Sequence, residues 1–271
     1  MTGIRTFSMV TAVVSVLVGV MWTGGHVQAE TLTVGATHSL KGAFQEIVPM
    51  FEKEYGATVR VVYGPSQTLR RQIEKGAQID VFLSAVEEIQ NLQKKGLTLN
   101  GGPRVYAQTS LVLVMSATSY ATQISFHDAL SNRGTRIALG DHETSAVGVT
   151  TARVLRKLDP AYRDRFRLLH AQHNEDIVNL VHTGQADVGI VYRVDAIRNS
   201  GQVLIIDETP AGTYTPVQFG QAVVWTCRDE ARGVAEEFFD FIASPRIQKL
   251  MLKYGFDPVP SNGSGIGGQK H

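Results

Sequence analysis

The chain alternates between short apolar runs with strand character and longer segments whose apolar residues recur every three to four positions. Residues 31–36 form the first run, and the segment after it carries an apolar stripe that includes Leu40, Phe44 and Phe51. The same alternation predicts further strands at residues 58–63, 80–83, 110–115, 136–139, 188–191 and 203–206. Repeated strand–helix units predict mostly parallel sheets with helices on both faces.

Several predicted helices have recognisable start and stop residues. Asn174 can cap a helix that stops at Gly184, and Ser244 with Pro245 opens the last helix as its N-cap and first helical residue. Pro49 lies inside the first apolar stripe and is expected to interrupt and kink that helix. Other helices are expected at residues 69–73, 86–95, 146–158 and 230–243.

The first 29 residues differ from the rest of the chain. Arg5 is the only charged residue before Glu30, and residues 9–22 are almost wholly apolar. A small-x-small pattern follows at Val27-Gln28-Ala29, so we expect a signal peptide that is cleaved after Ala29 and a mature protein in the periplasm or outside the cell. A membrane anchor is the alternative, but the apolar run is short for a bilayer span of about 20 residues.

Composition narrows the function classes. The hydrophobic fraction of 43% and charged fraction of 19% are ordinary for a soluble globular protein. The formal net charge of +1 shows no basic excess, which argues against nucleic-acid binding and means that any bound anion is held by local groups. The single cysteine, Cys227, excludes an internal disulfide and is expected to be a buried strand residue in the apolar run 221–227.

Short polar residues occur where predicted strands turn into helices: at Ser39, at Ser66, in residues 144–148 and at Asn174. A helix start exposes N–H groups without partners and carries roughly half a positive charge. Several helix starts aimed at one point would bind a dianion without a charged side chain, in a cleft between two groups of strand–helix units. The simpler alternative is that Ser39, Ser66 and Asn174 are only N-caps.

An ordered set of motifs resembles the periplasmic molybdate-binding proteins of ABC transporters. The set includes Ala36-Thr37-His38-Ser39-Leu40, residues 66–73, residues 76–85, Gly140-Asp141-His142-Glu143 with Val147-Gly148, Gly189-Ile190-Val191-Tyr192 and Lys253-Tyr254-Gly255-Phe256. The resemblance covers about residues 30–256. The chain departs from the family at His38, where a small residue is common, at His142, where proline is common, and at Val147, where alanine is frequent.

The resemblance implies an α/β fold of the two-lobed periplasmic binding protein type, with the ligand in the cleft between the lobes. Residues 30–107 and 218–258 would form lobe 1, residues 108–217 lobe 2, and residues 259–271 a disordered tail. The ligand would be molybdate or tungstate, held by serine hydroxyls, backbone N–H groups and a tyrosine hydroxyl. Carried over by position, these residues are Ser39, Ser66, Val147, Ile177 and Tyr192.

The same resemblance implies a binding protein and not an enzyme. It implies no cofactor and no cation site, a monomer, and a membrane permease of an ABC transporter as the partner that receives the anion. A second interpretation is an enzyme or sensor on the same scaffold. The sequence around Ser66 is evidence against an enzyme. It resembles the Gly-x-Ser-x-Gly nucleophile elbow of hydrolases but has Thr68 in place of the second glycine. His170 and His173 lack the further ligands of a metal site, so we expect them to be surface residues.

The choice of anion depends on Asp141 and Glu143. A carboxylate in the pocket would accept the proton of hydrogen phosphate but would repel fully ionised molybdate. The alternative is that both residues support the loop that carries them. Sulfate and phosphate therefore stay open as other ligands. The motifs do not assign roles to His38 and His142.

Overall fold

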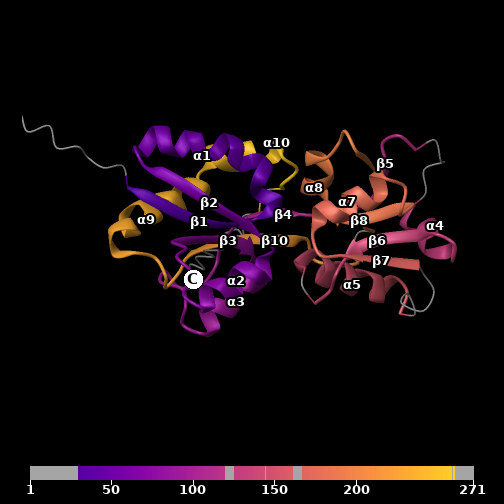
Figure 1. The fold of residues 1–271 in the computed structure, drawn as a ribbon, viewed down its shortest axis with the longest axis horizontal. Helices are drawn as coiled ribbons and strands as arrows, with labels where there is room; N and C mark the ends of the chain where they lie inside the picture. The colour runs from indigo at the N-terminus through magenta and orange to yellow at the C-terminus, as the bar shows by residue number, and fades with distance from the viewer. Residues whose placement is uncertain are drawn as a thin grey trace, which may run out of the picture.

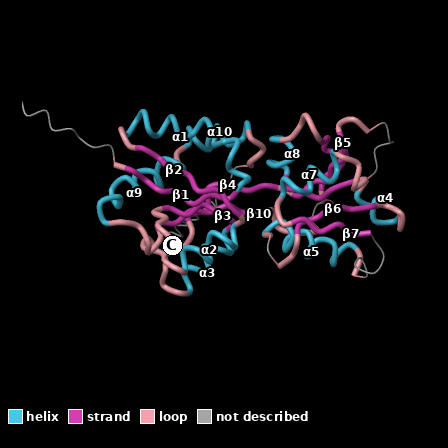
Figure 2. The backbone as a smooth tube through the Cα atoms, viewed as in Figure 1, coloured by secondary structure: helices cyan, strands magenta, loops and turns pink. Residues whose placement is uncertain are grey.

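The computed structural model describes residues 30–119, 125–143, 145–160, 167–210, 212–257 and 259. They form two lobes, each a five-stranded sheet with helices packed on it, which lie side by side along the long axis of the molecule (Figures 1 and 2). The predicted two-lobed α/β fold is confirmed. The expectation of mostly parallel sheets is wrong, because four strand pairs are parallel and four are antiparallel. The predicted signal peptide, Thr144 and the predicted tail other than Val259 lie outside the described residues.

Lobe 1 contains the beginning and the end of the described chain. Its sheet has the order β2-β1-β3-β10-β4, in which β1 pairs in parallel with β2 and β3, and β10 runs antiparallel to β3 and β4. The strands are β1 (Thr31–Thr37), β2 (Thr58–Gly64), β3 (Val81–Ala85), β4 (Arg104–Thr109) and β10 (Val217–Val223). The helices are η1 (His38–Leu40), α1 (Lys41–Tyr55), α2 (Ser66–Glu74), α3 (Val86–Lys94), η2 (Asp229–Ala231), α9 (Arg232–Ile242) and α10 (Pro245–Lys253).

Lobe 2 is built from the middle of the chain. Its sheet has the order β7-β6-β8-β5-β9, in which β6 is parallel to β7 and β8, and β5 is antiparallel to β8 and β9. The strands are β5 (Leu111–Ser116), β6 (Arg136–Gly140), β7 (Arg167–Ala171), β8 (Val188–Tyr192) and β9 (Val203–Glu208). The helices are α4 (Phe126–Ser131), α5 (Ala146–Leu158), α7 (Asn174–His182) and α8 (Arg193–Arg198).

The chain crosses between the lobes at two places. It leaves lobe 1 between Thr109 and Leu111, and it returns between Glu208 and Val217. Aromatic rings pack where the lobes meet: Tyr192 of β8 contacts Phe219 of β10 edge-on, with 6.1 Å between ring centroids. Phe219 in turn contacts Phe256 at 5.4 Å. These contacts fix the position of the Tyr192 ring at the boundary.

Two local predictions are wrong. Pro49 does not interrupt α1, which continues to Tyr55, because the missing proline N–H removes one helical hydrogen bond while Phe44 and Phe51 anchor the helix in the core on either side. Cys227 is not a strand residue: β10 ends at Val223, and the Cys227 N–H donates to the Val224 carbonyl at 2.8 Å in the turn that follows. The Cys227 side chain is half-buried.

Apolar burial holds the helices on the sheets. In lobe 1, Phe51 packs edge-on against Phe238 of α9 at 4.9 Å between centroids, and Phe44 contacts the same ring at 6.3 Å. Ser244 and Pro245 open α10 as N-cap and first helical residue, as predicted. Within the described part of the chain, no helix has the length and apolar character needed to cross a membrane.

Candidate ligand-binding site between the lobes

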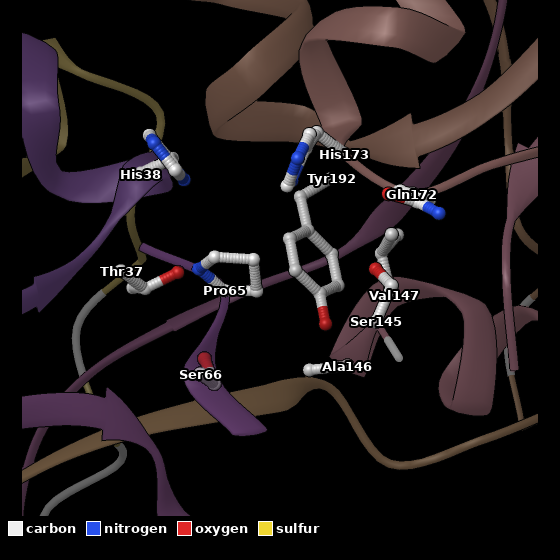
Figure 3. Close-up of a pocket in the computed structure, with 10 residues that line it drawn as sticks. All are labelled: Thr37, His38, Pro65, Ser66, Ser145, Ala146, Val147, Gln172, His173 and Tyr192. Atoms are coloured by element: carbon white, nitrogen blue, oxygen red, sulfur yellow. The ribbon is translucent and has the colours of Figure 1, made fainter. Parts of the chain in front are cut away.

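A small cavity lies between the lobes where the strands end. It encloses about 320 Å³ of space not filled by protein atoms, part of which is open to solvent. Figure 3 shows its lining residues, which are Thr37, His38, Pro65 and Ser66 from lobe 1 and Ser145, Ala146, Val147, Gln172, His173 and Tyr192 from lobe 2. They lie at or just after the carboxyl ends of β1, β2, β6, β7 and β8, where sheets of this kind bind ligands.

Helix starts surround this cavity. Ser66 is the first residue of α2, Ala146 is the first of α5, and His173 immediately precedes α7. The N–H groups of a first helical turn have no carbonyl four residues before them and point out of the helix. Together with the helix dipoles, they make this region favourable for negative charge.

Two glycines bring the start of α5 against the end of β6. A Cβ atom on Gly148 would lie 2.2 Å from the Asp141 carbonyl oxygen, and one on Gly140 would lie 2.7 Å from Val147 Cγ1. Only glycine leaves room for this approach at both positions. The close packing holds the Val147 N–H, in the second helical position, at the edge of the cavity.

Tyr192 brings a buried hydroxyl to the cavity. Its side chain extends past Pro65, and the hydroxyl points away from His38 and His173 toward the end where Ser66 and Ala146 lie (Figure 3). The hydroxyl has no hydrogen-bond partner among the described residues. The hydroxyl of Thr150, close by, already donates to the Ala146 carbonyl. Burial raises the pKa of Tyr192, and Thr150 offsets this only in part, so the phenol stays protonated and can donate.

The interpretation of three polar residues as N-caps is wrong. The residues in the cap positions are Thr37 before η1, Pro65 before α2 and His173 before α7. These residues have extended backbone torsions, so Ser39, Ser66 and Asn174 already lie inside the helices. The hydroxyl of Ser66 is therefore not used to close α2, and its side chain lines the cavity.

Ser66, Val147 and Tyr192 line the cavity, whereas Ser39 and Ile177 do not. The Ser39 hydroxyl donates to Asp195 Oδ2 at 3.1 Å, a contact between η1 of lobe 1 and α8 of lobe 2. The Ile177 N–H donates to the His173 carbonyl over 3.4 Å, which is long for a bond of this type.

Asp141 and Glu143 do not line the cavity. Asp141 Oδ1 accepts the Glu143 N–H at 2.8 Å, and the Asp141 carbonyl accepts the Ser145 N–H at 3.0 Å. The Asp141 carboxylate therefore supports its own loop. None of the described residues around the cavity is acidic, and no three His, Cys, Asp or Glu side chains in the described part of the chain could hold a metal ion.

The sequence patterns do not indicate Thr37, Gln172 and His173 as lining residues, and they indicate Ser145 only as part of the segment 144–148. Ser145 is the N-cap of α5, yet its hydroxyl does not bond to the helix, and the residue lines the cavity. Thr37 ends β1 directly before the predicted turn. Gln172 and His173 follow β7, a strand that the apolar pattern does not predict because Leu168 and Leu169 are only partly buried. Ligands bind at the carboxyl ends of strands in such sheets, so a prediction of β7 would also have indicated Gln172 and His173.

His38 and His173 face the cavity from opposite lobes. Their ring centroids are 6.0 Å apart, and the His38 ring also stacks on Tyr63 at 6.4 Å. Burial lowers the pKa of His38, although the nearby Glu175 carboxylate acts in the opposite direction. His38 is half-buried and His173 is exposed at the cavity edge.

Comparisons with known proteins agree with this architecture. A family model described as bacterial extracellular solute-binding protein matches residues 32–257. A lipoprotein of Bacillus subtilis, assigned to the substrate-binding components of ABC transporters, is 30% identical over 228 residues, or 83% of this chain and 86% of the relative. The molybdate-binding protein of Escherichia coli is 29% identical over 231 residues, or 83% of this chain and 88% of its own.

Solved structures share the two-lobed fold. The periplasmic molybdate-binding protein of Azotobacter vinelandii superposes with a TM-score of 0.72 at 25% identity, covering 84% of this chain and 99% of the other. A sulfate-binding protein of Mycobacterium tuberculosis has the same fold at 20% identity, with a TM-score of 0.72 over 86% of this chain and 88% of the other. The chain therefore belongs to the bacterial extracellular solute-binding proteins, whose family model spans both lobes.

Proposed function

We propose that this protein captures molybdate or tungstate in the cavity between its lobes and delivers the anion to the membrane permease of an ABC importer. The observation that carries the proposal is the buried Tyr192 hydroxyl, which has no hydrogen-bond partner among the described residues. It lies in a cavity lined by helix starts and hydroxyl groups, and none of the described lining residues is acidic. Molybdate and tungstate nearly coincide in charge and size, so the proposal treats them as alternative ligands of one site. The similarity to molybdate-binding relatives supports it.

The proposed donors are Ser39, Ser66, Val147, Ile177 and Tyr192. Ser66, Val147 and Tyr192 are the donors that the anion could use most readily. The Tyr192 hydroxyl has no partner among the described residues, the Ser66 hydroxyl does not cap α2, and the Val147 N–H is in the first helical turn. Ser39 would have to turn its hydroxyl away from Asp195. Ile177 is bound by a long hydrogen bond, so its N–H could be shared with an anion.

Further parts of the proposal concern the whole protein. Binding requires no cofactor, no cation and no covalent step, and the protein acts as a monomer and not as an enzyme. The signal peptide is removed after Ala29, which leaves the mature protein free in the periplasm. Mass spectrometry of the secreted protein tests the cleavage site, because the expected N-terminal residue is Glu30.

Sulfate is the second candidate ligand. Like molybdate it carries no proton at neutral pH, so a site made of donors accepts it, and a sulfate-binding protein shares the fold. Sulfate is smaller, however, and its oxygens would leave some donors of a molybdate-sized site unpaired. Each buried unpaired donor costs about 1–3 kcal/mol. Two unpaired donors would favour molybdate by roughly 30-fold to 10⁴-fold.

A thermal unfolding panel tests the proposal. Molybdate, tungstate, sulfate and phosphate are each added to the mature protein, and the shift in melting temperature is recorded. A ligand at 100 times its dissociation constant stabilises the folded state by about 2.7 kcal/mol. We expect molybdate and tungstate to raise the melting temperature at micromolar concentrations. No shift with any of the four anions would contradict the proposal, and a shift with sulfate alone would replace it with the second candidate.

A further inference from the structure

Two imidazole rings lie at the end of the cavity opposite the Tyr192 hydroxyl. His38 follows β1 in lobe 1 and His173 follows β7 in lobe 2, so the pair bridges the cleft (Figure 3). With 6.0 Å between ring centroids, a small anion that contacts the edge of one ring is within reach of the other. Both side chains line the cavity.

The charged groups around His38 come from several elements. Glu175 of α7 is the acidic neighbour, whereas Lys41 of α1 and Arg198 of α8 are basic, and Tyr63 of β2 stacks on the ring. Arg198 is already engaged, because it donates to the His38 carbonyl at 2.6 Å and pairs with Glu175 at 3.3 Å. The His38 backbone is thus fixed to lobe 2, while its ring remains directed at the cavity.

We infer that His38 and His173 extend the oxyanion site, each donating a ring N–H to the bound anion, so that one imidazole from each lobe closes over it. The inference rests on the proposed function and assigns two donors beyond its set. Ser66 and Tyr192 would hold the inner end of the anion, and the imidazoles would hold the outer end. Because one imidazole comes from each lobe, binding of the anion would at the same time connect the two lobes.

Proton linkage distinguishes this arrangement from a site of neutral donors. A dianion beside an imidazole favours its charged form, so binding raises the histidine pKa and takes up protons. Molybdate affinity should therefore rise as pH falls from about 8 to 6, by up to about tenfold per pH unit for each proton taken up. Serine hydroxyls and backbone N–H groups alone would give an affinity that does not change over this range.

The test is isothermal titration calorimetry with molybdate at pH 6, 7 and 8, in two buffers of different protonation enthalpy at each pH. The comparison of buffers counts the protons taken up by the wild-type protein without any substitution. The same titration is made with His38→Gln and His173→Gln, in which the amide can still donate but cannot be charged. His142→Gln and His170→Gln are the matched controls, because those rings also lie 6.5 Å apart but outside the cavity.

We expect proton uptake by the wild-type protein and by both control variants. We expect His38→Gln and His173→Gln to lose about 10- to 100-fold in affinity at pH 6, with less uptake and a flatter pH profile. Molybdate binding without proton uptake, unchanged in both variants, would overturn the inference and leave the proposed function intact. If the wild-type protein bound no oxyanion, both would fall. If a variant failed to fold, the wild-type proton count would still decide.

Discussion

The hydroxyl group of Tyr192 is buried at the inner end of the cavity and has no partner in the described residues. An unpaired buried hydroxyl costs about 1–3 kcal/mol, which a bound acceptor would recover. Phe219 holds the ring from lobe 1, so the hydroxyl cannot move to solvent without breaking the contact between lobes. The Tyr192 hydroxyl is therefore expected to destabilise the protein without ligand and to stabilise the complex with the bound anion.

Replacing Tyr192 by phenylalanine should separate these effects. Without ligand, Tyr192→Phe should be as stable as the wild-type protein or more stable by up to about 1–2 kcal/mol, because an unpaired polar group is removed. Molybdate affinity should fall, but by less than for the serine variants if a water replaces the hydroxyl. Chemical denaturation and calorimetry measure the two quantities. A loss of unliganded stability with unchanged affinity would show that the hydroxyl has a structural role instead.

Ser39 and Ser66 should behave differently when each is replaced by alanine. Ser39 donates to the fully buried Asp195 carboxylate, and a hydrogen bond to a charged group contributes about 1.5–3 kcal/mol. Ser39→Ala should therefore lose that stability without ligand and also bind molybdate more weakly. Ser66→Ala should lose affinity alone. Equal stability of the two variants in denaturant would contradict this distinction.

These residue roles could be predicted from sequence only in part. The strand-to-helix turns indicate Ser66 and residues 144–148, and the family resemblance implies Val147 and Tyr192; Ser66, Val147 and Tyr192 all line one cavity. The partner of Ser39 could not be predicted, because Asp195 is 156 positions away and belongs to the other lobe. The imidazole pair was missed for the same reason: a contact between His38 and His173 exists only once the two lobes are placed.

Among the secondary-structure elements, the start of α5 depends on the glycines at Gly140 and Gly148. A Cβ at position 148 would overlap the Asp141 carbonyl oxygen, so Gly148→Ala must push α5 away from β6. We expect a stability loss of about 1–3 kcal/mol and weaker molybdate binding, since the Val147 N–H moves with the helix. Thermal unfolding and calorimetry on the same variant measure both effects.

Gly233 of α9 provides the matched control. A Cβ there would meet no atom within 4 Å, so Gly233→Ala should leave binding unchanged and gain up to about 1 kcal/mol of stability from the better helix former. Similar losses for both variants would show that substitution of any helical glycine is harmful, and that the approach of α5 to β6 is not the cause.

The apolar pattern predicted most elements but not all. It predicted β1, β2, β3, β5, β6, β8 and β9 and most of the helices, because their apolar residues are buried in a regular repeat. It did not predict β4 or β7, in which several residues are exposed or only partly buried, and it extended β10 to Cys227, where a turn competes with the strand. Local hydrogen bonds determine where these strands form and end, and the apolar pattern of the sequence carries no information about those bonds.

At the scale of the whole molecule, the site exists only because two sheets present their strand ends to one another. The first turn of lobe 1 is tied to α8 of lobe 2 by Ser39 with Asp195 and by Arg198 with the His38 carbonyl. Each lobe alone carries only some of the proposed donors. We therefore expect anion selectivity to depend on both lobes together, whose described lining residues include donors and no acidic residue.

A competition titration tests that claim most directly. The protein is loaded with molybdate at neutral pH, and phosphate or sulfate is added while the bound molybdate is measured. Hydrogen phosphate carries a proton that needs an acceptor, so we expect phosphate at equal concentration to leave molybdate bound. Sulfate should displace molybdate only at roughly 30-fold excess or more. Displacement of molybdate by phosphate at equal concentration would contradict a site built from donors and, with it, the assignment to molybdate.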